Sequence, residues 1–190
     1  NAGKKEYKPE LLHLPNYLTA KADPAVLRPG KMGKLVVTLK SNQLHGLGLT
    51  QSSVYLSRFA GDRVNKDNEL GISVTLLPNF TAAELNSPQA PLADMATSID
   101  LGAFNGKSKL KGTVVLTNKG QSPLVINMLQ VYNPGISVAL SKTTLRPGES
   151  TDMKIVVSSA VERFRGSRKV LLITNDPRHP KISLDVITKK

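Results

Sequence analysis

Apolar and polar residues alternate in short segments along this chain of 190 residues. Alternation with a period of two is typical of half-buried β-strands, and no segment of twelve or more residues shows the apolar period of a helix. The pattern therefore predicts an all-β protein. In the second half it predicts seven strands, over Ser98–Ala103, Leu110–Thr117, Leu124–Leu129, Ile136–Leu140, Thr151–Ser158, Lys169–Thr174 and Lys181–Ile187. Turns rich in Asn, Gly and Pro separate them, and seven short strands in about 95 residues are typical of an immunoglobulin-like sandwich.

The tetrapeptide Leu-Arg-Pro-Gly occurs twice, at residues 27–30 and at residues 145–148. When the chain is shifted by 118 residues, the two copies coincide and 22 residues align without a gap. Alternating apolar residues align as well. Leu35, Val37 and Leu39 fall on Met153, Ile155 and Val157, and further on Val54, Leu56, Ile72 and Val74 fall on Val170, Leu172, Ile182 and Leu184. A repeat that carries its strand pattern predicts a duplicated fold, in which each tetrapeptide makes the turn before a strand with three inward-facing apolar residues.

The repeat divides the chain into three parts. We predict an immunoglobulin-like sandwich over residues 1–77, a proline-containing linker over 78–97, and a seven-stranded immunoglobulin-like sandwich over 98–190. Within the linker, Thr81 and Glu84 have the spacing of a capping box, which predicts one helical turn.

The two copies differ in completeness. Asn118-Lys119-Gly120 in the second copy is matched by Asn1-Ala2-Gly3 in the first, which leaves Ser98–Ala103 and Leu110–Thr117 without counterparts. The first sandwich is therefore expected to lack its first two strands, unless Asn1-Ala2 is a cloning scar or Glu10–Leu14 pairs as a substitute edge strand. Missing strands expose apolar faces and unpaired backbone. We expect residues upstream of Asn1, a neighbouring chain or the second sandwich to cover that edge, and self-association through the first sandwich is one form of this expectation.

Charge and composition narrow the classes of function. The formal net charge is +12, from 26 Lys and Arg against 14 Asp and Glu, so attraction to a polyanion is expected at low salt. The sequence has no cysteine, which excludes disulfides, thiol catalysis and sulfur-ligated metal. No apolar run approaches the roughly 20 residues that span a bilayer, and the first residues lack the order of a signal peptide, although a removed signal would leave no trace here.

Several segments in order resemble one bacterial family. They are Ile99–Gly102, Val114–Gly120, Pro123–Ile126, Leu145–Ser150 and Ile173–Pro177. In sequence and spacing they are similar to the domain of unknown function numbered fifteen seventy-three, which is akin to Hydin-type immunoglobulin-like modules. The resemblance covers nearly all of residues 98–188 and more loosely 18–77. It implies an immunoglobulin-like sandwich in an exported, periplasmic or cell-surface protein, with no established chemistry.

One family feature is missing from this chain. Many members carry a Cys-Gly-Cys segment soon after the stretch that corresponds to Pro123–Ile126, whereas this chain has Asn127–Val131 in that place. A metal or redox role suspected for such cysteines therefore does not carry over.

Candidate catalytic and metal-binding groups are sparse. His13, His45 and His179 lie in separate segments without metal-ligand spacing, and no catalytic triad can be assembled from the sequence. His179 and Asp176 resemble a base with its orienting acid, but the prolines around them favour an exposed hairpin turn. The loop over residues 62–69 offers oxygen ligands for calcium, yet its two cations favour a solvated insertion between strands.

The basic run over residues 163–169 is the sharpest candidate contact site. Arg163, Arg165, Arg168 and Lys169 are able to bind phosphate or carboxylate groups, and an aromatic residue lies among them. The alternative interpretation is a hairpin connection whose charges keep a sheet edge soluble.

These observations favour a non-enzymatic structural or protein-interaction module of the bacterial cell envelope, with a protein as its partner and neither cofactor nor metal. The alternative is a polyanion-binding protein that recognises nucleic acid or an acidic polymer through its basic surface. Only eight aromatic residues and no tryptophan are available for stacking, which argues against nucleic acid. An enzyme with a site spread over loops finds no support in the sequence.

Overall fold

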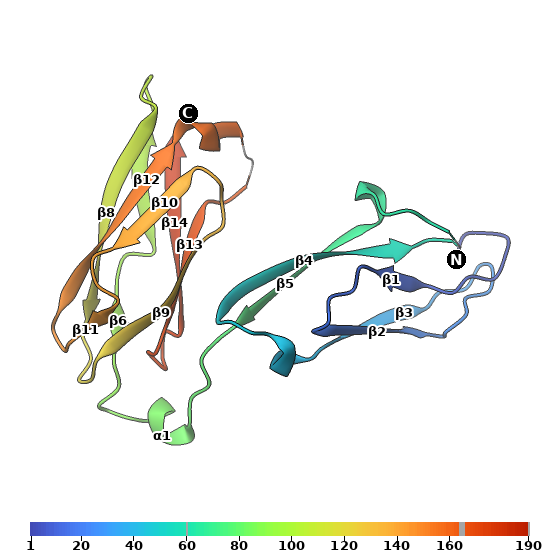
Figure 1. Cartoon of the computed structure of the whole chain (residues 1–190), viewed down its shortest axis with the longest axis horizontal. Coiled ribbons are helices and arrows are strands. Elements are labelled where there is room, and N and C mark those ends of the chain that lie inside the picture. Colours follow the sequence, from blue (N-terminus) through green and yellow to red (C-terminus); the bar gives the residue numbers. More distant parts are fainter. Residues whose placement is uncertain (60, 164–165, 190) are drawn as a thin grey trace. The chain divides into compact units, whose positions relative to one another are not determined.

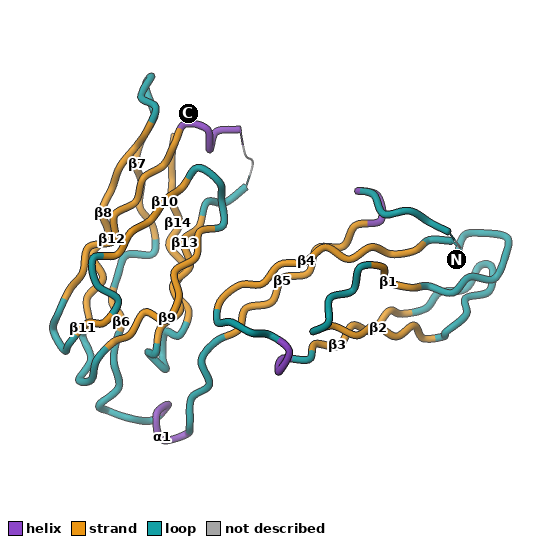
Figure 2. The backbone as a smooth tube through the Cα atoms, viewed as in Figure 1, coloured by secondary structure: helices purple, strands orange, loops and turns teal. Residues whose placement is uncertain are grey.

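The computed structural model describes residues 1–59, 61–163 and 166–189. The chain divides into two compact units, unit 1 (Asn1–Leu76) and unit 2 (Leu77–Lys190). Strands dominate both units (Figures 1 and 2), which confirms the all-β prediction.

The predicted strands of unit 2 are all present. Its strands are β6 (Ala93–Asp94), β7 (Ser98–Ala103), β8 (Lys109–Asn118), β9 (Leu124–Val131), β10 (Ile136–Leu140), β11 (Thr144–Leu145), β12 (Ser150–Ser158), β13 (Lys169–Thr174) and β14 (Lys181–Lys189). All seven predictions are confirmed to within two residues at each end. The sequence missed β6 and β11, because two residues are too few to show an alternation.

Unit 2 is built from two sheets that share one apolar core. One sheet has the order β10-β12-β8-β6, and the other has the order β11-β9-β13-β14-β7, with β14 and β7 parallel. Alternate residues of β12, among them Met153, Ile155 and Val157, are fully buried in the core, whereas the residues between them are partly or fully exposed. A two-layer sandwich of this kind stabilises both sheets by burying one face of each.

The segment before β7 carries a helical turn and a short strand. Helix α1 (Ala82–Leu85) begins with a capping box in which the Thr81 hydroxyl accepts from the Glu84 N–H and the Glu84 carboxylate accepts from the Thr81 N–H, as predicted. The Thr81 N–H and hydroxyl together hold the pKa of Glu84 below its ordinary value. Strand β6 pairs with β8 through Ala93 and Asp94, so the end of this segment is part of the sheet of unit 2.

Unit 1 has fewer strands and a smaller core. Its strands are β1 (Glu10–Leu12), β2 (Leu18–Asp23), β3 (Lys34–Leu39), β4 (Gly48–Ser57) and β5 (Glu69–Leu76), and its 3-10 turns are η1 (Ser41–Gln43) and η2 (Lys66–Asn68). They form the sheets β1-β4-β5 and β2-β3. Among the described residues, four apolar side chains are buried in unit 1, Tyr17, Leu18, Leu27 and Val54, against eighteen in unit 2. Unit 1 therefore has much less buried apolar surface to stabilise it.

Candidate functional site: the free edge of strand β3

The hairpin β2–β3 of unit 1 repeats the hairpin β10–β12 of unit 2 residue for residue. Five cross-strand pairs of unit 1 coincide with pairs of unit 2 when 118 is added to each number. They are Leu18↔Leu39, Thr19↔Thr38, Ala20↔Val37, Lys21↔Val36 and Ala22↔Leu35, against Ile136↔Val157, Ser137↔Val156, Val138↔Ile155, Ala139↔Lys154 and Leu140↔Met153. The backbone therefore keeps the register that the aligned sequences predict.

The turn that joins the two strands of this hairpin is also repeated. The glycine of each Leu-Arg-Pro-Gly has a positive φ, 71° at Gly30 and 77° at Gly148, a conformation that glycine adopts without strain. The Gly30 N–H donates to the Asn1 carbonyl and the Gly148 N–H donates to the Asn118 carbonyl, both at 2.8 Å. Each tetrapeptide thus makes a tight turn that is fastened to an asparagine.

Asn1 and Asn118 occupy the same position in the two copies. The Asn118 Nδ2 donates to the carbonyls of Leu145 and Ser122, at 3.0 and 2.8 Å. The Asn1 Nδ2 donates to the carbonyls of Leu27 and Lys5, at 2.8 and 2.9 Å. Each Oδ1 accepts from the glycine two residues further on, at 2.9 Å. Asn1 thus makes in unit 1 the same kinds of hydrogen bond that Asn118 makes in unit 2.

The two hairpins differ in what lies beside them. In unit 2, β12 is an inner strand that pairs with β10 on one side and with β8 on the other. In unit 1, β3 pairs with β2, and no strand of the described residues pairs with its other edge. Within the described part of unit 1, the place that β8 holds in unit 2 is therefore without a strand. We call this unpaired side of Lys34–Leu39 the free edge of β3.

The free edge changes the burial of the repeated apolar residues. Met153, Ile155 and Val157 are all 0% exposed, because β8 and the core cover them. Their counterparts Val37 and Leu39 are 41% and 42% exposed. Val37 and Leu39 are therefore not buried within unit 1, since alternation alone does not supply a strand that covers them.

Backbone groups are directed toward the free edge from alternate residues. The Lys40 N–H donates to the Tyr17 carbonyl on the β2 side at 2.8 Å. N–H and C=O groups of successive residues point to opposite sides of a strand, so those of Leu35, Val37 and Leu39 face away from β2. In the repeat, the corresponding residues of β12 pair with β8. The free edge therefore offers the hydrogen-bonding pattern that an added antiparallel strand requires.

The alignment of the later strands was wrong in one respect. It placed Val54 on Val170 and Val74 on Leu184, and Val170 does pair with Leu184 in unit 2. In unit 1, however, Val54 pairs with Leu70. The hairpin β4–β5 is thus shifted relative to the alignment, because its longer loop over residues 58–68 moves the register of β5. Glu10–Leu12, within the predicted Glu10–Leu14, does pair as an edge strand, but it pairs with β4 and not with β3, so it does not fill the free edge of β3.

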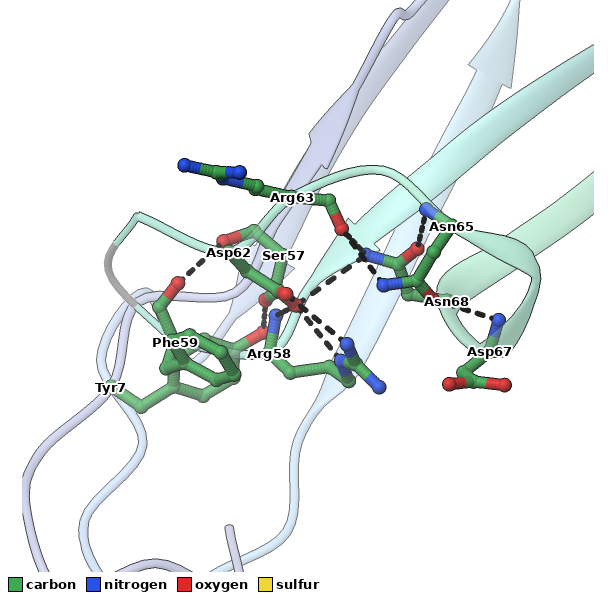
Figure 3. A network of polar contacts seen from close by, with 9 residues as sticks. All are labelled: Tyr7, Ser57, Arg58, Phe59, Asp62, Arg63, Asn65, Asp67 and Asn68. Carbon is green, nitrogen blue, oxygen red and sulfur yellow. Dashed lines mark hydrogen bonds and ion pairs between the residues drawn. The ribbon is translucent and has the colours of Figure 1, made fainter.

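A polar network closes the loop between β4 and β5 (Figure 3). The Arg58 guanidinium donates to both carboxylate oxygens of Asp62, at 2.8 and 3.1 Å, and the Arg58 N–H donates to the same carboxylate. These bonds hold the pKa of Asp62 well below its ordinary value. Asn65 and Asn68 cap the turn η2. The loop that the sequence offered for calcium thus has its Asp62 carboxylate, 3% exposed, already paired with a cation.

A groove of about 890 Å³ lies beside this network in unit 1. Its lining includes Tyr7, Phe59 and the cations Lys4, Lys5, Lys8 and Arg58. The acidic residues Glu6, Glu10 and Asp62 also line it, so its charges are mixed. Burial raises the pKa of Tyr7, whose hydroxyl donates to the Ser57 carbonyl (Figure 3). These contacts fasten the N-terminal segment to β4.

The basic run of unit 2 is only partly described. Arg165 lies outside the described residues, and Arg163 ends the turn η3 (Ser159–Arg163). The Arg168 Nη2 donates to the Val161 carbonyl at 3.5 Å, and the Lys169 Nζ pairs with Asp185 at 2.6 Å across β13 and β14. Arg168 and Lys169 thus have contacts within unit 2, and a partner-binding role for the run stays a prediction.

Asp176 has a role that the sequence did not reveal. Its carboxylate is fully buried and accepts from the backbone N–H groups of Ala93 and Arg178, at 2.9 and 2.8 Å. The His179 Nδ1 lies 3.0 Å from the same carboxylate, and the His179 side chain is about half exposed. Asp176 thereby holds the start of β6 against the turn after β13. The signal that was available is the Asn-Asp-Pro sequence, in which an acidic residue precedes a turn proline.

Known proteins resemble this chain in fold. A crystal structure of a protein of unknown function from Porphyromonas gingivalis W83 is 21% identical, with a TM-score of 0.71 over 100% of this chain and 87% of that chain. The Vibrio cholerae VesB protease is 13% identical, with a TM-score of 0.44 over 92% of this chain and 49% of that chain. The secreted serine protease VesC from Vibrio cholerae is 14% identical, with a TM-score of 0.36 over 92% of this chain and 36% of that chain. The first likeness shows the fold alone, and the two proteases are too distant to inform on activity.

No curated protein matches the chain significantly. A family model does: the HYDIN/CFA65/VesB-like, Ig-like domain matches residues 91–187. The match covers β6 to β13 and most of β14, and it confirms the Hydin-type part of the resemblance. Because it spans more than half of the sequence, the chain belongs to the HYDIN/CFA65/VesB-like family of immunoglobulin-like domains.

Proposed function

We propose that this protein is a non-enzymatic protein-interaction module of the bacterial cell envelope, and that it acts through the free edge of β3. In this proposal the chain is a tandem of two immunoglobulin-like sandwiches, over residues 1–77 and 98–190, and residues 78–97 form the linker between them. The first sandwich lacks two strands. Export to the periplasm or cell surface, and membership of family fifteen seventy-three, belong to the same proposal and rest on the resemblance of the sequence. In the described part of the chain, no helix has the length and apolar character to cross a membrane.

The unpaired side of β3 carries this proposal. An exposed strand edge presents unpaired N–H and C=O groups, and binding of an extended segment to such an edge is a common mode of protein recognition. Exposed Val37 and Leu39 lie along the same strand and supply apolar surface for an added strand to cover. Natural proteins usually protect a long free edge, so an edge left open beside apolar residues favours a binding role.

A selection experiment tests the proposal. A displayed library of random peptides is selected on the wild-type chain and on Val37→Pro, which removes one N–H directed toward the free edge while the pairing of β3 with β2 keeps its hydrogen bonds. Val37→Ala is the matched control, because it shortens the same side chain and keeps the N–H. We expect peptides with alternating apolar residues to be enriched on the wild type and on Val37→Ala, but not on Val37→Pro. Enrichment of the same peptides on all three proteins would refute the proposal.

Polyanion binding is the alternative function, with an acidic polymer as the ligand. The net charge of +12 favours it, whereas the mixed charges of the groove in unit 1 do not. Binding to heparin across a salt series distinguishes the two functions, because neutralising several phosphate or sulfate groups makes affinity fall steeply with salt. The alternative is supported by a steep slope that becomes shallower when Arg163, Arg165, Arg168 and Lys169 are replaced by Ser. Weak binding that does not change with salt excludes it.

A further inference from the structure

The charges beside the free edge of β3 indicate which kind of strand it accepts. We propose that the edge binds an extended segment of another protein, antiparallel to β3, with apolar residues at alternate positions and acidic residues opposite Lys34 and Lys40. This inference rests on the proposed function and adds the chemistry of the partner to it.

Strand β8 of unit 2 shows how such a segment fits, because it fills the same place beside β12. The strands are antiparallel, and their paired residues include Met153↔Val114, Ile155↔Gly112 and Val157↔Leu110. Val114 and Leu110 are buried, and Gly112 lies against Leu101 and Ile99, where a Cβ atom would lie within 2.7 Å of a side-chain carbon of each. Through the repeat, these pairs assign apolar residues of the partner to the positions opposite Leu35 and Leu39.

The free edge of β3 and the matching edge of β12 carry different charges on the face that lies opposite the repeated apolar residues. In unit 2, Asp152 lies opposite Val115 and Ser158 lies opposite Lys109. The counterparts in unit 1, shifted by 118, are Lys34 and Lys40, and both are exposed. A strand with the lysine of β8 would therefore meet Lys40 with a like charge, whereas a strand with acidic residues at both positions would form two cross-strand pairs.

The residues around Lys34 and Lys40 leave both side chains available to pair with carboxylates of a partner strand. On the β2 side, Asp23 lies opposite Lys34 in the register. Among the ion pairs of the described residues, none involves Lys34 or Lys40. An incoming carboxylate therefore displaces no ion pair of unit 1.

A second copy of the chain fits the edge less well. If β3 pairs with β3 of another copy so that Leu35 lies opposite Leu39 and Val37 opposite Val37, then Lys34 lies opposite Lys40 at both ends. Like charges directly opposite each other destabilise a strand pair. The pattern of charges therefore favours an acidic partner over self-association.

Two peptides with the same apolar residues provide the test. Both derive from residues 109–118, Lys-Leu-Lys-Gly-Thr-Val-Val-Leu-Thr-Asn, and keep Leu110, Val114 and Leu116. The acidic peptide carries Lys109→Glu and Val115→Glu, and the basic peptide keeps Lys109 and carries Val115→Lys. Binding to the full chain is measured by fluorescence anisotropy, and hydrogen exchange of the Leu35, Val37 and Leu39 amides shows whether the peptide occupies the free edge.

We expect the acidic peptide to bind at least about fourfold more tightly than the basic one at low salt, because two cross-strand pairs change from like to opposite charge. The difference should shrink with added salt. The double variant Lys34→Glu with Lys40→Glu should reverse the preference, which a general attraction of the basic protein for acidic peptides would not do.

Each result bears on a different part of the inference. Equal affinities with protection of the three amides overturn the charge requirement and leave the proposed function intact. A preference that persists in the double variant also overturns it. If neither peptide protects these amides, both the inference and the proposed function fail. Protection of these amides before any peptide is added means that another copy or another segment already fills the edge, and this overturns a separate partner.

Discussion

Truncating the same repeat position in the two units tests whether the free edge of β3 is open in solution. The substitutions are Ile155→Ala in unit 2 and Val37→Ala in unit 1, which coincide when 118 is added to the lower number. Ile155 is fully buried, and its truncation removes three carbons at about 0.8 kcal/mol each and leaves a cavity, so we expect a loss of about 3 to 4 kcal/mol. Val37 loses two carbons from a side chain that is 41% exposed, and water fills the space, so we expect about 1 kcal/mol.

The measurement must read each unit separately, because a chain of two compact units need not unfold in one step. Native-state hydrogen exchange at increasing denaturant gives the free energy of opening from amides within each unit. Val115→Ala is the control in unit 2, since this side chain of β8 is 52% exposed and its truncation should cost less than about 1 kcal/mol. A cost of about 3 kcal/mol for Val37→Ala would refute the reasoning, because it would mean that something covers the free edge.

Three further predictions concern the turns and the polar network. Asn118→Ala should destabilise unit 2 by about 3 kcal/mol, since it leaves buried carbonyls and N–H groups without partners. Asn1 is more exposed, so Asn1→Ala should destabilise unit 1 by only about 1 kcal/mol. Hydrogen exchange within each unit measures both losses. Gly148→Ala should lower the stability of unit 2 by about 1 kcal/mol, because alanine is strained at a φ of 77°. Hydrogen exchange of amides within unit 2 measures this loss. The hydrogen bonds and ion pair with Arg58 lower the pKa of Asp62 in the folded state. The ion pair therefore contributes to the free energy of unfolding of unit 1 above about pH 4, and this contribution is lost as the pH falls through the lower folded pKa. Asp62→Asn should make the stability of unit 1 depend less on pH below about pH 4, which hydrogen exchange within unit 1 at several acidic pH values measures.

Much of the architecture could be predicted because it depends on local patterns. Seven of the nine strands of unit 2 follow from alternation and turn residues, which are both visible in one sequence. The repeated hairpin could be predicted too, because the aligned residues 18–39 and 136–157 carry the same apolar positions. Register follows from such a pattern when one face of a strand is buried.

The burial of β3 could not be predicted in this way. Alternation tells which residues share a face of a strand, but it does not tell whether another strand lies beside them. Val37 and Ile155 occupy the same place in their hairpins, but they differ in exposure because β8 pairs with β12 and no described strand pairs with that side of β3. The role of Asp176 could not be predicted for a related reason. Its carboxylate accepts from the N–H of Ala93, which lies 83 residues away in the sequence.

The repeated register of the two hairpins has a consequence for folding. In the unfolded chain, the segments that become β3 and β12 have the same pattern of alternate apolar residues. Either segment can therefore pair with the segment that becomes β8. A wrong pairing of β8 with β3 would give a strand-swapped species, which is a characteristic misfolding route of repeated domains. Such a pairing would place Lys109 opposite Lys40, whereas the correct one places it opposite Ser158. Because like charges directly opposite each other destabilise a strand pair, Lys40 disfavours the wrong pairing relative to the correct one.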